Sequence, residues 1–457
     1  MIVRVYLLVS LSLLAALGLL LLLHGRQSFY FIQGPPDAAS VAMKFAAFAI
    51  GWTLLGLLIV SRHVMWLWRK HSVFLVALLL IGFLYLNAIR EPHRVDVGDF
   101  RAYFLAAVDI QAKRPIDQQA GRLYLYPPLL AVILQPTVNL GLTHLAVLFR
   151  FANFAAILLL SCLIYLTLQR CGFSRESAAA VVFLAVCPNV PILRTLIYNQ
   201  VNMHVVNLVL VSVLLWPRLK ALSALALTLA IHLKVYPVAF TIVFLWSRQW
   251  SWLFWFVVSN LGIVGITSLA GGFHYYIDFF AQISQLKETG IRNTSVDSLV
   301  YNTARILGIA PVPEGLVLAG KLGLIAVLAR PLAAAMNSAM FTEESGQRDS
   351  VLKAYLVLPV AMLVISPTIW EHYPVFLLPT ATALVPEIRT EGQAWVFAIC
   401  YAFLFLFPVN EVYPVSYLRL AAIVGLGLLM GSIAKQGTTG KATWFTVLEK
   451  RLAESRR

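Results

Sequence analysis

Long apolar runs separated by short polar segments follow one another along almost the whole chain. A transmembrane helix needs about 20 apolar residues, and the runs predict about twelve such helices. They cover residues 4–23, 41–60, 72–89, 143–168, 176–192, 200–216, 251–270, 314–330, 351–366, 373–386, 394–409 and 416–433. Three further apolar stretches, 128–140, 221–232 and 236–247, are too short to span a membrane. The last two flank a break at 232–237 and are predicted to form a broken or re-entrant pair.

The composition supports this pattern, because 60% of the 457 residues are hydrophobic and only 12% are charged. Soluble domains hold about 45–50% apolar and about 25% charged residues. An ordinary soluble enzyme, a disordered chain and a collagen-like rod are therefore excluded. The predicted fold class is an all-α polytopic membrane protein, a bundle of about twelve transmembrane helices with short re-entrant helices and extracytoplasmic loop helices. We expect residues 1–434 to form one transmembrane domain and residues 435–457 a basic cytoplasmic tail.

Basic residues indicate the orientation, since cytoplasmic loops of membrane proteins carry an excess of Lys and Arg. The net charge is +15, and many of the basic residues lie in short loops or in the tail. Placing these in the cytoplasm puts both termini inside and puts loops 90–127 and 271–313 outside. Loop 90–127 is nevertheless rich in Arg and Lys. Two explanations stay open: the charge bias is only statistical, or this loop faces lipid phosphates.

Polar residues that are costly in a membrane gather at the predicted outer ends of the helices. They are Asp96, Asp99, Tyr124, Tyr126, Gln200, Asn202, Lys234, Asn293 and His372. Each has an ordinary explanation when taken singly, such as a helix cap for Asp99, an interfacial aromatic for Tyr124 or a headgroup contact for Lys234. Their gathering on one face, from segments far apart in sequence, favours a functional site.

Several short motifs occur in order among these residues. They are Asp99-Phe-x-x-Tyr103, Tyr124-Leu-Tyr126-Pro-Pro, Gln200-Val-Asn202, Lys234-Val-Tyr-Pro, Asn293-Thr-Ser and Ser366-Pro-x-x-Trp-x-His372. The set spans roughly residues 95–380 and resembles glycosyltransferase family 87 of the GT-C superfamily. Three positions depart from the family pattern: Asn199 replaces a glycine, Thr294 replaces a glutamine, and Tyr373 replaces a second histidine.

The resemblance implies an integral membrane hexosyltransferase that takes a sugar, typically mannose, from a polyprenyl-phosphate donor. The acceptor is expected to be a glycolipid or glycan outside the cytoplasmic membrane. Asp99 is implied as the general base, with Asp96 as the alternative. One carboxylate near the acceptor fits a single displacement with inversion. Because the leaving group is already a phosphate, we expect no metal and no cofactor beyond the lipid-linked donor, and no nucleic-acid partner.

The remaining roles follow as hypotheses from the chemistry of phosphate and sugar groups. His372 is expected to orient the base or contact the phosphate. Lys234 pairs with the donor phosphate as a compact charge, helped by Arg101 or Arg122. The amides of Gln200, Asn202 and Asn293 bind sugar hydroxyls, and Tyr103, Tyr124 and Tyr126 also contact substrate.

Other functions stay open at this stage. A polyprenyl-linked glycan transporter or flippase would place ionisable groups near mid-membrane and often shows internal repeats, which this sequence lacks. A lipid-oligosaccharide ligase would carry its large outer loop late in the chain. A non-catalytic membrane subunit would not need this gathering of polar residues. The transferred sugar is open between mannose and a pentose such as arabinose.

Overall fold

The computed structural model describes residues 81, 85, 99–116, 124–284, 293–309, 311–338, 340, 346–407 and 414–436. Every element in these ranges is helical. In chain order they are α5 (Asp99–Gln111), α6 (Leu129–Leu134), η3 (Gln135–Leu140), α7 (Leu142–Arg170), α8 (Arg175–Val186), α9 (Val190–Ile197), α10 (Asn202–Leu215), α11 (Lys220–Leu233), η4 (Tyr236–Phe240), α12 (Thr241–Trp246), α13 (Trp250–Ala270), α14 (His274–Ser284), α15 (Val296–Ile306), α16 (Glu314–Asn337), α17 (Gly346–Ile365), η5 (Tyr373–Leu377), α18 (Leu378–Leu384), η6 (Val385–Glu387), α19 (Glu391–Tyr401), the π-helical turn η7 (Ala402–Leu406), η8 (Val415–Tyr417) and α20 (Leu418–Lys435).

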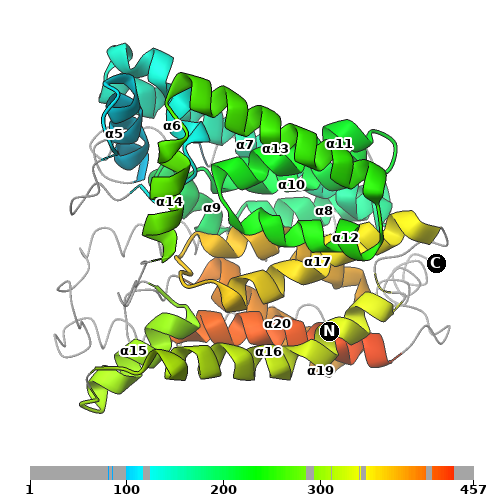
Figure 1. Ribbon diagram of the computed structural model, residues 1–457. Coiled ribbons are helices and arrows are strands. Elements are labelled where there is room, and N and C mark those ends of the chain that lie inside the picture. The colour runs from blue at the N-terminus through cyan, green and yellow to red at the C-terminus, as the bar shows by residue number, and fades with distance from the viewer. Residues whose placement is uncertain are drawn as a thin grey trace.

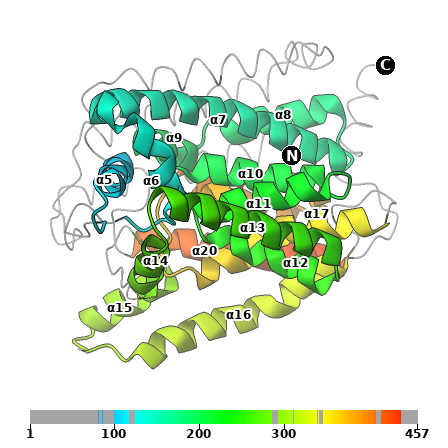
Figure 2. The same cartoon turned by 45° about the horizontal axis from the view of Figure 1, so that its top comes forward.

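The longer helices lie side by side as a bundle (Figure 1). Helix α10 packs between α7 and α11, and α11 also packs on α13. Helix α20 packs on α16, α17 and α19. Helices α5, α14 and α15 gather at one end of the bundle, the left end in Figure 1, and Figure 2 shows them at the same end after rotation. These three helices belong to the two loops that the sequence places on one side of the membrane.

Four helices of the described ranges are long and apolar enough to cross a membrane: Leu142–Arg170, Trp250–Ala270, Glu314–Asn337 and Val415–Lys435. The pair α8 and α9, bent by 57° at its break, raises this number to five. Helices α13 and α16 leave most of their apolar side chains on the outside of the bundle, as expected for surfaces in contact with lipid. The all-helical membrane fold is therefore confirmed, whereas the count of about twelve spans is not.

Several predicted helices correspond to shorter or divided ones. The prediction over 176–192 corresponds to α8 and α9, which are separated because Asn189 caps α9 and Pro191 lies in its first turn. The break predicted at 232–237 is present between α11 and η4. Whether this pair is re-entrant stays a prediction. The predicted helices at 4–23, 41–60 and 72–89 and the tail lie outside the described residues, apart from Ile81, Tyr85, Lys435 and Gln436.

Candidate active site

Asp99 begins helix α5, where a carboxylate interacts favourably with the positive end of the helix dipole. Its Oδ2 atom lies 3.3 Å from the hydroxyl of Tyr126. The same hydroxyl lies 3.1 Å from Oε1 of Gln200, which also accepts a bond of 3.2 Å from Tyr103. Tyr103 lies one turn after Asp99 and therefore on the same helix face. The network joins α5, the Tyr-x-Tyr-Pro-Pro segment and the turn before α10.

Three tyrosine rings form one wall of this site. Tyr103 contacts Tyr126 edge to face, with ring centres 4.8 Å apart, and contacts Tyr124 in the same way at 6.3 Å. The hydroxyl of Tyr124 donates to the carbonyl of Pro127 at 2.9 Å. Buried edge-to-face pairs hold aromatic side chains in fixed positions. The wall therefore fixes Tyr126 beside Asp99.

Lys234 enters the site from the break between α11 and η4. The helix ends at Leu233, Lys234 has an extended backbone, and Pro237 starts the next turn. Its buried ammonium group donates to Oδ1 of Asn202 at 2.7 Å and lies 3.9 Å from the ring centre of Tyr373. An ammonium has only donors, so this bond fixes the orientation of the Asn202 amide. The Nδ2 atom of Asn202 is buried with no hydrogen-bond partner in the described part of the chain.

The turn between α9 and α10 carries Gln200 and Asn202 to these positions. Asn199 adopts a positive φ of 53°, a region that suits glycine and that asparagine tolerates better than other side chains. Its amide also donates to the carbonyl of Ala146 at 2.7 Å and accepts from Asn153 at 3.2 Å. Asn199 thus adopts a backbone conformation that glycine also tolerates, and its side chain ties the turn to α7.

Asn293 connects the loop before α15 to the loop after α17. Its Oδ1 accepts from the backbone N–H groups of Ser295 and Ile369 at 3.0 and 2.8 Å, and its Nδ2 donates to the carbonyl of Pro367 at 3.0 Å. Thr294 adds a backbone and a hydroxyl bond to the carbonyl of Ile369. The Asn293 amide is therefore engaged with the backbone on both its oxygen and its nitrogen. Its bond to a sugar stays a prediction.

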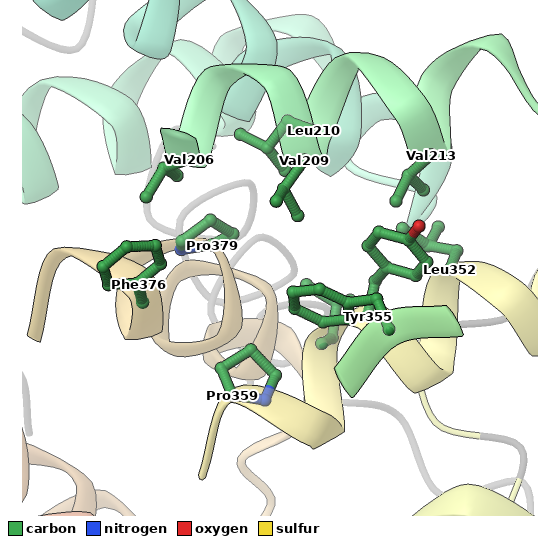
Figure 3. Close-up of a pocket in the computed structure, with 11 residues that line it drawn as sticks. Val206, Val209, Leu210, Val213, Leu352, Tyr355, Pro359, Phe376 and Pro379 are labelled. Carbon is green, nitrogen blue, oxygen red and sulfur yellow. The ribbon is translucent and has the colours of Figure 1, made fainter. Parts of the chain in front are cut away.

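An apolar cavity begins one turn beyond the polar residues (Figure 3). Val206 lies one turn after Asn202 on α10, Phe240 follows Tyr236 in η4, and Phe376 follows Tyr373 in η5. Figure 3 shows Val206, Val209 and Val213 directed from α10 toward the side chains of α17 and η5. The polar site therefore adjoins a hydrocarbon-lined space.

Desolvation changes the protonation of the two principal charged groups. It raises the pKa of Asp99 to about 6, against the opposing effects of the Lys234 charge and the Tyr126 hydrogen bond. It lowers the pKa of Lys234 to about 7, against the opposing charge of Asp99. Since a general base works best when its pKa lies near the operating pH, Asp99 is suited to accept a proton at neutral pH.

The site agrees with a match to a known family. The model of glycosyltransferase family 87 matches residues 124–367, more than half of the chain. The chain belongs to glycosyltransferase family 87. It is also 26% identical, over 73% of its length and 79% of the relative's, to a polyprenol-phosphate-mannose-dependent alpha-(1-2)-phosphatidylinositol mannoside mannosyltransferase of Mycolicibacterium smegmatis. No solved structure matches the chain.

Within this family 87 site, the described structure brings most of the predicted residues together and leaves a few apart. Asp99, Tyr103, Tyr126 and Gln200 form one network, while Lys234 and Asn202 form the adjoining one. Arg101 is exposed on α5. Asp96 and Arg122 lie outside the described residues, as do parts of loops 90–127 and 271–313. In the described ranges no three His, Cys, Asp or Glu side chains are placed to hold a metal ion. The predicted absence of a metal stays a prediction.

Two buried charges of this glycosyltransferase were missed by the motif analysis. Arg194 of α9 forms an ion pair with Glu371, the residue before His372. Arg419 of α20 is completely buried. Burial, followed by the positive charges of Lys234 and of these two arginines, lowers the pKa of His372 well below its usual range. A neutral His372 can accept a hydrogen bond. Arg419 had a sequence signal, since a charge within an apolar span indicates function.

Proposed function

We propose that this family 87 glycosyltransferase is a membrane mannosyltransferase that uses a polyprenyl-phosphate-mannose donor. The family and the name of the mycobacterial relative support the donor class. The observation that carries the proposal is the meeting of Asp99 and Lys234 around Tyr126, whose hydroxyl lies 3.3 Å from the Asp99 carboxylate and whose ring centre lies 5.7 Å from the Lys234 ammonium. Glycosyl transfer from a lipid phosphate needs a base for the acceptor and a cation for the leaving group.

In the proposed reaction the acceptor hydroxyl gives its proton to the Asp99 carboxylate. The acceptor oxygen attacks the anomeric carbon, and the bond from that carbon to the phosphate oxygen breaks. The phosphate leaves with the electron pair, and Lys234 balances its growing negative charge. Glu371 is paired with Arg194, so we assign the base to Asp99 among the described residues. A single displacement inverts the configuration of the anomeric carbon.

The other site residues hold the substrates in this scheme. Tyr126 and Gln200 orient the Asp99 carboxylate, and the free Nδ2 of Asn202 donates to a sugar or phosphate oxygen. His372 accepts a hydrogen bond from substrate.

The reaction is assigned to the extracytoplasmic side of the cell membrane, with both termini in the cytoplasm. The Lys and Arg pattern of the loops supports this orientation. The gathering of α5, α14 and α15 at one end of the bundle is consistent with both motif loops lying on the same side (Figure 1). The acceptor is a glycolipid or glycan, and the relative's phosphatidylinositol mannoside is the first one to test.

The experiment uses the full chain in lipid nanodiscs with radiolabelled polyprenyl-phosphate mannose and phosphatidylinositol mannoside. We expect labelled mannose in a larger glycolipid, with none formed by empty nanodiscs or by Lys234→Ala at low donor concentration. Transfer from a polyprenyl-phosphate pentose in place of mannose would make the sugar assignment wrong. No glycosidic product in nanodiscs, with movement of the labelled lipid across the bilayer of sealed proteoliposomes, would instead support a flippase.

A further inference from the structure

Arg419 is the second residue of α20, a helix that is otherwise apolar enough to span a membrane. Its side chain is fully buried. The Nε and Nη1 atoms have no hydrogen-bond partner among the described residues, and Nη2 reaches only the carbonyl of Phe407 at 3.5 Å. A buried arginine with two N–H-bearing atoms that lack an acceptor among the described residues is expensive to keep. Its presence in an apolar span therefore calls for a ligand that supplies the missing acceptors.

The surroundings of Arg419 join it to the candidate active site. Besides burial itself, the positive charges of Lys234, Arg194 and Arg419 each lower the pKa of the buried His372 side chain. Glu371, the neighbour of His372, forms an ion pair with Arg194, and its negative charge also favours the charged form of Arg419. The negative charge of Asp99 favours the charged form of Lys234, although the two groups form no ion pair within the described structure. The three cations thus face two carboxylates, so this buried region carries an excess of positive charge.

Several buried polar atoms without a hydrogen-bond partner among the described residues are capable of donating. They include Nδ2 of Asn202, the hydroxyl of Ser416, and Nε and Nη1 of Arg419. Ser416 precedes Arg419 by three residues in one continuous helical segment, so the two side chains share a face. Ser416 is also completely buried. Phosphate oxygens accept hydrogen bonds, and a guanidinium binds them through two N–H groups at once.

We propose that Arg419, together with the hydroxyl of Ser416, binds a phosphate group of a lipid substrate in this site. The proposal rests on the proposed function and adds to it a phosphate contact from α20, which lies beyond the family match at residues 124–367. The donor carries a phosphate, and so does a phosphoinositide acceptor. Both offer the same chemistry to Arg419, and the experiment distinguishes them.

The test measures equilibrium binding to the full chain in nanodiscs without any transfer step. Farnesyl phosphate is compared with farnesol, and phosphatidylinositol with diacylglycerol. For Arg419→Met we expect about 10- to 100-fold weaker binding of one phosphate probe, the range for a lost hydrogen bond to a charged group. The neutral probes keep their affinity. Ser416→Ala weakens the same probe by less, and Arg419→Lys restores part of the affinity. The control, Arg330→Met, removes an exposed arginine of α16.

Thermal unfolding of the ligand-free protein separates this role from a structural one. Replacing a buried arginine whose N–H groups are only partly satisfied by an apolar side chain relieves its desolvation cost, so we expect the Tm of Arg419→Met to stay equal or rise. Loss of farnesyl phosphate binding identifies the donor phosphate, and loss of phosphatidylinositol binding identifies the acceptor phosphate. Unchanged binding of both probes overturns the proposal. So does a lowered Tm with weakened binding of the neutral probes. Because no mannosyl transfer is measured, these results are independent of whether the proposed reaction occurs.

Discussion

The ammonium nitrogen of Lys234 lies 3.9 Å from the centre of the Tyr373 ring, at the position where the family motif has a second histidine. An aromatic face attracts a cation without neutralising it. Within the described structure Lys234 has no carboxylate at ion-pair distance, and its one hydrogen-bond acceptor is Asn202. Tyrosine at this position therefore supports the charge of Lys234 and leaves it able to pair with an incoming phosphate.

This environment predicts a fall in kcat/KM for the donor at alkaline pH. As the pH rises through about 7, Lys234 loses its proton and its attraction for phosphate. Since arginine stays charged to above about pH 12, Lys234→Arg is expected to lose this alkaline limb even if its maximal rate is lower. The measurement is kcat/KM for the donor from pH 5 to pH 9, a range set around the two shifted groups. If the alkaline limb persists in Lys234→Arg, a group other than Lys234 causes it.

The acid limb of the same profile belongs to Asp99. Below about pH 6 its carboxylate binds a proton and no longer acts as a base. The hydrogen bond from Tyr126 lowers the pKa of Asp99, so Tyr126→Phe is expected to move the acid limb to higher pH. The maximal rate should fall about tenfold, the scale of one hydrogen bond to a charged group.

Tyr124→Phe is the matched control for this change. The Tyr124 hydroxyl bonds to the Pro127 carbonyl rather than to Asp99. Its loss is expected to leave the acid limb where it is in the wild type. An equal shift in both variants would mean that the limb reports the general packing of the tyrosine wall and not the Asp99 contact.

Because Asn293 hydrogen-bonds to the backbone of two loops, its replacement is expected to lower stability rather than sugar affinity alone. Asn293→Ala leaves the buried N–H groups of Ser295 and Ile369 without their acceptor, at a cost of about 1–3 kcal/mol for each unpaired group. We expect a lower Tm and a lower kcat. Thr294→Val removes the neighbouring bond from the Thr294 hydroxyl to the Ile369 carbonyl. It should lower the Tm and kcat by less than Asn293→Ala does. An unchanged Tm with a raised KM would support the sugar contact instead.

The sequence indicated which polar residues lie close together better than it predicted the extents of the helices. Asp99, Gln200 and Lys234 could be found because costly polar groups at fixed spacing in apolar surroundings are a strong signal. The pairing of Arg194 with Glu371 could not be found, because periodicity does not tell which helix ends meet. The division of 176–192 into α8 and α9 depends on the local effects of Asn189 and Pro191. Hydropathy also cannot separate a spanning helix from a shorter buried one such as α11.

The most direct test of the central claim is the single-turnover rate of mannosyl transfer by Asp99→Asn. This change keeps the size of the side chain and removes the base. We expect a rate about 10²- to 10⁴-fold lower than that of the wild type, the usual contribution of general base catalysis, with donor affinity changed little. The control is Asp109→Asn on the same helix, where Asp109 pairs with Arg114, and it should transfer mannose close to the wild-type rate. Transfer by Asp99→Asn at the wild-type rate would contradict the account.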